Sequence, residues 1–198
     1  LVWNLFTAAL SGATSSVVDN AGIVKKVYFP REILPLASVG AAIVHYLLQL
    51  SVLVMMLVAF QHNIDWSLLW LLPIALVTLL VFVSALGILF SAINVYSRDM
   101  KHLLELILLA WFWLTPVVYP YKTFHTSGFF GLIADLIRAN PMAAIITPFQ
   151  KVIYVNERVK STLKPHNVIS ILPNQDVLWY VRNLSLTLAF SIALFFFA

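Results

Sequence analysis

The feature that most constrains this sequence is a run of 32 residues, from Trp66 to Ser97, without one Asp, Glu, Lys, Arg or His. An α-helix rises ~1.5 Å per residue, so about 20 apolar residues cross the hydrocarbon core of a bilayer. The composition agrees, because 10% of the residues are charged, against roughly 25% in soluble domains. The run therefore predicts a membrane protein.

Five apolar segments divide the chain into predicted spans and connections. They are Leu1–Val18, Ile33–Phe60, Trp66–Ile93, Leu103–Tyr119 and Val177–Ala198. Each is near or above spanning length, which predicts an all-α, polytopic membrane helical bundle forming one domain over residues 1–198. The chain opens without a Met and stops inside an apolar run, so we expect an internal fragment of a longer protein.

The basic residues predict how the chain crosses the membrane. The connections over 19–32 and 94–102 contain Lys25, Lys26, Arg31, Arg98 and Lys101, whereas the connection over 61–65 contains neither Lys nor Arg. With alternating crossings the first and third connections share a side, which the positive-inside rule makes cytoplasmic. The connection over 120–176 is expected outside, because it is long and the rule weakens far from a span.

The long fourth connection contains two short apolar segments, over 131–138 and 142–155, separated by Asn140-Pro141. Neither is long enough to cross a bilayer alone. Two such helices at one membrane face predict a re-entrant or interfacial external hairpin. The alternative is a folded external loop with a small core of its own.

The first connection carries a basic and aromatic segment between two prolines. Asp19 or Asn20 can cap a short helix that Pro30 ends, and Pro35 suits the first turn of the next span. Such a helix on the cytoplasmic surface can dock a partner, or it can be an ordinary positive-inside anchor. In the third connection Asp99 is a good N-cap for the helix that follows, and Arg98 can pair with an acidic partner or a lipid phosphate.

An aromatic cluster over 111–121 marks the end of the fourth segment. Tyr119 and Tyr121 fit an interfacial aromatic belt, whereas Trp111 and Trp113 are expected deeper, about 9–12 Å along a helix. Tryptophan rings inside a conduit can stack on sugar faces and donate hydrogen bonds through their indole N–H groups. Belt and conduit lining both remain open.

Several functional classes lack support in the sequence. There is no cysteine and no phosphate-binding Gly-x-x-x-x-Gly-Lys loop, and we expect no catalytic residues and no metal site. A membrane-embedded enzyme would need clustered groups, but His45, His125 and His166 are scattered along the chain. The net charge of +4 reports membrane topology rather than nucleic-acid binding.

The chain resembles the ABC-2 type permeases of the polysaccharide-export group, which move O-antigen, teichoic acid, capsule or galactan chains. Two motifs carry most of the likeness, Tyr28-Phe29-Pro30-Arg31 with Pro35, and the downstream Ser97-Arg98-Asp99 loop. Further matching residues are Trp3-Asn4-Leu5-Phe6, Asp19-Asn20, Lys25-Lys26-Val27, Asn94-Val95-Tyr96, Thr115-Pro116-Val117-Val118-Tyr119 and Asn140-Pro141-Met142.

The resemblance implies a six-helix subunit, here lacking an N-terminal amphipathic helix, the first span and the end of the last. It also implies a homodimer in the bacterial inner membrane with a separate ABC ATPase, which binds ATP and Mg; this chain would hold no cofactor. The ATPase-coupling residues would be Lys25, Lys26, Val27, Tyr28, Phe29, Arg31, Ser97, Arg98, Asp99 and Met100.

The expected substrate is a lipid-linked polysaccharide, and the residues expected along its path are Trp111, Trp113, Tyr119 and Phe6. An ABC-2 permease for a small lipid or drug would share the coupling loops and differ only in its cargo. A membrane-embedded enzyme that modifies a glycan or lipid, and a non-catalytic membrane scaffold, are further alternatives.

Overall fold

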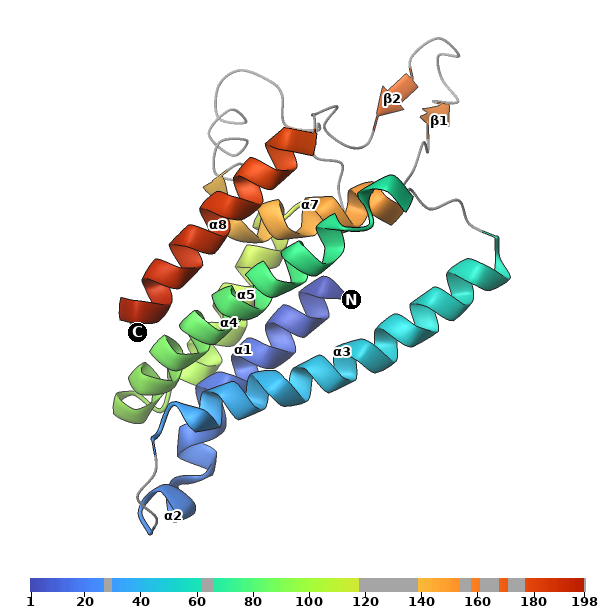
Figure 1. The fold of residues 1–198 in the computed structure, drawn as a ribbon. Coiled ribbons are helices and arrows are strands. Elements are labelled where there is room, and N and C mark those ends of the chain that lie inside the picture. Colours follow the sequence, from blue (N-terminus) through green and yellow to red (C-terminus); the bar gives the residue numbers. More distant parts are fainter. Residues whose placement is uncertain are drawn as a thin grey trace. The chain divides into compact units, whose positions relative to one another are not determined.

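The structure, a computed structural model, describes residues 1–26, 30–61, 66–117, 139–153, 158–160, 168–170 and 177–197 (Figure 1). The elements are α1 (Val2–Asp19), α2 (Ala21–Val24), α3 (Ile33–Ala59), the 3₁₀ turn η1 (Trp66–Leu68), α4 (Leu71–Tyr96), α5 (Met100–Leu114), α7 (Pro141–Ile153), β1 (Arg158–Lys160), β2 (Val168–Ser170) and α8 (Val177–Phe197). The predicted helical class is confirmed. The one addition within these residues is an antiparallel hairpin, in which Arg158 pairs with Ser170.

Three of the described helices are long and apolar enough to cross a membrane: α3, α4 and α8, with mean hydropathies of 2.2, 2.6 and 1.5. The helix α1 has 18 residues but is more polar, and α5 has only 15 residues. The crossing of the bilayer by α1 and α5 therefore stays a prediction.

Two predicted helix boundaries were wrong by five residues, and each lies beside a proline. The helix α4 begins at Leu71 rather than Trp66, and Pro73 lies in its first turn, where a missing N–H is harmless. The helix α5 ends at Leu114 rather than Tyr119. Thr115 precedes Pro116, and the residue before a proline is disfavoured in helical conformation.

The chain divides into two compact units. Unit 1 comprises Leu1–His62, Val77–Ala110 and Leu188–Ala198, and unit 2 comprises Asn63–Leu76 and Trp111–Thr187.

In unit 1 the helix α1 contacts both α3 and α4. Its buried residues are Val2, Leu5, Phe6, Ala9, Leu10, Ala13, Thr14 and Ser16. The ring of Phe6 stacks on Phe82 of α4 with centroids 6.0 Å apart. Toward α3, a Cβ placed on Gly12 would lie 3.6 Å from the Cβ of Ser38, an ordinary van der Waals contact.

The buried hydroxyl groups of α1 donate hydrogen bonds to backbone carbonyls of the same helix. Thr14 Oγ1 donates to the carbonyl of Leu10 (2.8 Å), and Ser16 Oγ donates to the carbonyl of Ala13 (2.7 Å). Hydroxyl bonds to carbonyls one turn earlier let Ser and Thr lie inside a helix without an external partner. These residues are therefore buried without the cost of an unpaired polar group.

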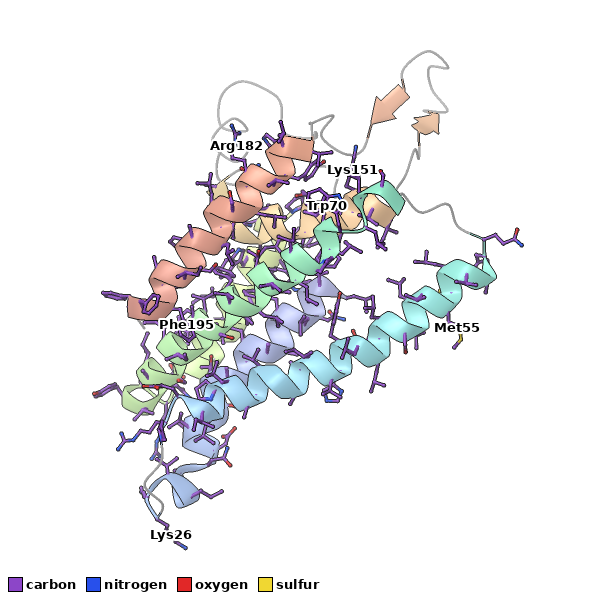
Figure 2. All side chains as sticks on the ribbon, viewed as in Figure 1. Lys26, Met55, Trp70, Lys151, Arg182 and Phe195 are labelled. Atoms are coloured by element: carbon purple, nitrogen blue, oxygen red, sulfur yellow. The ribbon has the colours of Figure 1, made fainter. Side chains whose placement is uncertain are left out.

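The helix α3 packs through its amino-terminal half only. Its buried residues, Pro35, Val39, Ala42 and Tyr46, recur at helical spacing and end well before the carboxyl terminus. Beyond them the side chains are exposed, as Met55 is at 71%. Figure 2 shows Met55 on the side of α3 that faces away from α1.

Unit 2 is organised around α7, which packs on η1. Most of α7 is buried, including Met142, Ile145 and Val152, although Pro148 lies inside the helix. This helix confirms the second of the two short helices predicted in the fourth connection. The first, over 131–138, lies outside the described residues.

Candidate functional site

The helices α1 and α4 run parallel, and their carboxyl ends lie on the same side of unit 1. In chain order, Phe6 stacks on Phe82, Gly87 approaches Ala13, and Asn94 bonds to Thr14. Thr14 is five residues from the end of α1, and Asn94 is two residues from the end of α4. The prediction that the first and third connections share one side is therefore confirmed.

In the first connection the short helix is shorter than predicted. It ends at Val24, before Lys25 and Lys26, instead of continuing to Pro30. The side-chain amide of Asn20 does not cap it, but donates to the carbonyl of Ser16 at the end of α1 (2.8 Å). The predicted coupling residues Val27, Tyr28 and Phe29 lie outside the described residues.

The basic side chains of both connections are accessible. Lys25 and Lys26 form an exposed turn after α2, and Figure 2 shows Lys26 at the tip of this connection. Arg31 is exposed, and Ser97, Arg98 and Asp99 are exposed between α4 and α5. Asp99 is the residue directly before α5, the position predicted for its N-cap, and Met100 is half-buried. The loop-end surface, as it is called below, consists of Lys25, Lys26, Arg31, Ser97, Arg98, Asp99 and Met100.

Sequence reasoning missed two apolar residues beside these charges. Tyr96, the last residue of α4, is 94% exposed, and Ile23 of α2 is 54% exposed. Fully exposed aromatic side chains near a cluster of basic residues are common in protein-binding surfaces, where Tyr and Arg are enriched. The available signal was the position of Tyr96 at the end of the long apolar run, two residues before Arg98.

In unit 2, Asn140 joins the end of α5 to the start of α7. Its Oδ1 accepts hydrogen bonds from the Trp111 indole N–H (2.9 Å) and from the backbone N–H of Met142 (3.0 Å). Its Nδ2 donates to Oγ1 of Thr115 (2.9 Å). Asn140 is thus the N-cap of α7, with Pro141 as the first helical residue. Nearby, Gln150 Nε2 donates to the carbonyl of Pro116 (2.9 Å).

Three of the four residues predicted along the substrate path are described by the structure. Phe6 belongs to unit 1 and is fully buried, while Trp111 and Trp113 belong to unit 2. Because α5 ends at Leu114, both tryptophans lie in its last turn, so the expected depth along a longer helix was wrong. Trp113 is 67% exposed, and Tyr119 lies outside the described residues.

The residues of the enzymatic alternative are not gathered where they are described. His45 is exposed on α3, and His125 and His166 lie outside the described residues. Within the described part of the chain, no group of three His, Cys, Asp or Glu side chains could hold a metal ion. His102 lies 3.9 Å from Glu105, and both side chains are exposed.

Long apolar helices with exposed basic connections on one side define a polytopic helical membrane protein. The model of the ABC-2 type transporter family matches residues 1–154, and the chain belongs to that family.

Three curated relatives are named O-antigen export system permease protein RfbA. One, from Myxococcus xanthus, is 30% identical over 154 residues, which are 78% of this chain and 58% of the relative. Two, from Klebsiella pneumoniae, are each 27% identical, over 149 residues (75% of this chain, 56% of the relative) and 184 residues (93% and 67%). The chain thus spans less than three fifths of the length of the first two relatives.

Proposed function

We propose that this chain is part of the membrane-spanning permease subunit of an ATP-driven exporter, which moves a lipid-linked polysaccharide across the cytoplasmic membrane. Membership of the ABC-2 type transporter family supports the transport role. The O-antigen export named for its relatives supports the choice of cargo. The permease works as a homodimer with a separate ABC ATPase, which binds the ATP and Mg.

The loop-end surface carries this proposal. Two connections far apart in the sequence emerge on one side of unit 1, and each presents exposed basic residues there. The positive-inside rule makes this the cytoplasmic side, where an ATPase is located. Exposed cations beside Ile23 and Tyr96 suit a partner surface that combines acidic side chains with an apolar pocket.

Charge reversal tests the docking role. We expect Arg98→Glu, and separately the pair Lys25→Glu and Lys26→Glu, to weaken co-purification of the ATPase and to lower polymer export. The physical reason is that rim charges steer and orient a charged partner. Lys151→Glu, at the end of α7 in unit 2, is the matched control and leaves co-purification unchanged. Undiminished co-purification and export in the Arg98 and lysine variants would contradict the proposed surface.

The substrate path is proposed along the aromatic side chains near the end of α5. Trp113, which is two-thirds exposed, presents ring surface of the kind that packs on the apolar face of a sugar. Trp111 and Tyr119 complete this proposed path, and Phe6 is its predicted member in unit 1.

A further inference from the structure

The helices α1 and α4, which lead into the two parts of the loop-end surface, approach each other very closely. A Cβ placed on Gly87 of α4 would lie 2.8 Å from the Cβ of Ala13 on α1, a separation that real Cβ atoms essentially never show. Only a glycine permits this spacing at position 87. Small residues that let helix backbones approach are a main source of helix association in membranes.

Near the cytoplasmic end of the same contact, Asn94 bonds α4 to α1. Its side chain is 3% exposed, and its Nδ2 donates to the backbone carbonyl of Thr14 (3.0 Å). This is a contact between residues 80 positions apart in the chain. Further along the pair, Phe6 stacks on Phe82, so the two helices are joined at three successive levels.

The oxygen of the Asn94 side-chain amide, unlike its nitrogen, does not join the two helices. Its Oδ1 is buried and accepts no hydrogen bond from any described residue. An unpaired buried acceptor is destabilising, and a leucine, which has the same branching, would remove it. Stability alone therefore does not explain an asparagine here. The hydrogen bond that its Nδ2 donates to Thr14 explains the asparagine, because an aliphatic side chain cannot supply it.

We infer that Asn94 is a positioning residue for transport, which together with the Gly87–Ala13 contact holds α1 and α4 as one rigid pair. The connections over 20–32 and 97–99 then move together when the ATPase moves either of them. This inference rests on the proposed function, because it concerns the same loop-end surface. Tight packing supports it, since packed helices transmit displacement as rigid bodies.

Spin labels can measure the rigidity of the pair directly. The 198 residues contain no cysteine, and Asp19→Cys and Val95→Cys, both exposed and near the ends of α1 and α4, introduce one label pair per subunit. Any cysteine elsewhere in the complex is replaced by Ser. Labelled subunits are diluted with cysteine-free subunits, so that each proposed homodimer carries a single label pair. The measurement uses the full-length permease in its complex with the ATPase, with and without ATP. We expect one narrow distance distribution by electron paramagnetic resonance, unchanged by ATP, while polymer export proceeds.

Two substitutions are expected to loosen the pair. Asn94→Leu removes the donor to Thr14 and keeps the branching and the number of heavy atoms of the side chain, and Gly87→Ala forces the helices apart. In both we expect a broader distance distribution that changes with ATP, and a several-fold loss of export. ATPase co-purification is retained, because the exposed residues of the loop-end surface are unaltered.

A compensating change and a matched control separate this effect from general damage. Adding Ala13→Gly to Gly87→Ala restores the space between the helices and should restore the narrow distribution and the export. Gly40→Ala places a methyl group in open space on α3 and should alter neither. Asn94→Leu is expected to retain the melting temperature, which a purely structural role for Asn94 would not allow.

The inference and the proposed function fail in different ways. A label distance that shifts with ATP in the unsubstituted permease, or a narrow distribution in both Asn94→Leu and Gly87→Ala, would overturn the rigid pair. Absence of any co-purifying ATPase from the unsubstituted permease would contradict the proposed function instead.

Discussion

The indole N–H of Trp111 donates a 2.9 Å hydrogen bond to Oδ1 of Asn140, 29 residues later in the chain. The same oxygen accepts the N–H of Met142, so one amide both caps α7 and ties it to the last turn of α5. Trp111 was expected to offer its indole N–H to a sugar, and in this structure that donor is bound within the protein. Asn140 therefore fixes the position of α7 relative to the aromatic end of α5.

Replacing Asn140 with Ala should destabilise this region. The substitution removes an N-cap, which is worth about 1 kcal/mol, and the hydrogen bond from the Trp111 indole N–H, which is worth about 0.5–1.5 kcal/mol. We expect a loss of about 2 kcal/mol and a lower melting temperature in detergent. Asn140→Asp keeps both accepted hydrogen bonds and should lose less. Equal melting temperatures for Asn140→Ala and the unsubstituted protein would contradict the joint role of Asn140.

The tryptophans of α5 are expected to differ in function. Trp113→Ala removes an exposed ring, so it should lower export roughly two- to tenfold, the equivalent of one aromatic contact of about 0.5–1.5 kcal/mol, while melting is unchanged. Trp111→Phe keeps a ring and loses the bond to Asn140, so it should lower the melting temperature by the loss of about 1 kcal/mol. Export assays in intact cells at matched protein levels check both. Normal export in the Trp113 variant would remove it from the substrate path.

Phe6 tests whether a predicted path residue is instead a packing residue. Its ring is fully buried against Phe82, so Phe6→Ala should cost about 3 kcal/mol through the cavity it leaves. Phe60→Ala, at a site that is 74% exposed, is the matched control and should change stability by less than about 0.5 kcal/mol. Thermal unfolding in detergent measures both. Unchanged melting with reduced export in Phe6→Ala would instead support the place of Phe6 on the substrate path.

Cysteine labelling tests the predicted orientation. The 198 residues contain no cysteine, so in a permease freed of any cysteine elsewhere Lys26→Cys and Lys160→Cys can each be labelled alone with a membrane-impermeant maleimide. We expect Lys160→Cys to react in intact cells or spheroplasts and Lys26→Cys to react only after the membrane is opened, as the positive-inside rule predicts. Reaction of both positions from the same side would overturn the topology.

The uncharged apolar runs were sufficient to locate the helices, because the length of such a run depends only on the local sequence. The predicted segment Ile33–Phe60 became α3, Ile33–Ala59, and the predicted Leu1–Val18 became α1, Val2–Asp19. Boundaries next to prolines were less accurate, as the ends at Leu71 and Leu114 show. At both boundaries the apolar sequence extends beyond the point at which the helix begins or ends.

The candidate site was predictable as a list of residues and not as an arrangement. The exposure of Lys25, Lys26 and Arg98 follows from their charge, since basic side chains at span ends remain in water. Tyr96 was missed because an aromatic residue at the end of an apolar run looks the same whether it is buried or exposed. The burial of Phe6 was not predictable for the converse reason, because ring chemistry alone does not indicate which ring packs inside the fold.

The sequence by itself determined that the chain is a helical membrane protein with basic connections, because bilayer thickness and the cost of buried charge act on each segment separately. Only the tertiary structure decided that Asn94 meets Thr14 and that Asn140 meets Trp111. Such partners are chosen by the close packing of helices remote in the sequence, and no local pattern specifies the rotation that brings two faces together.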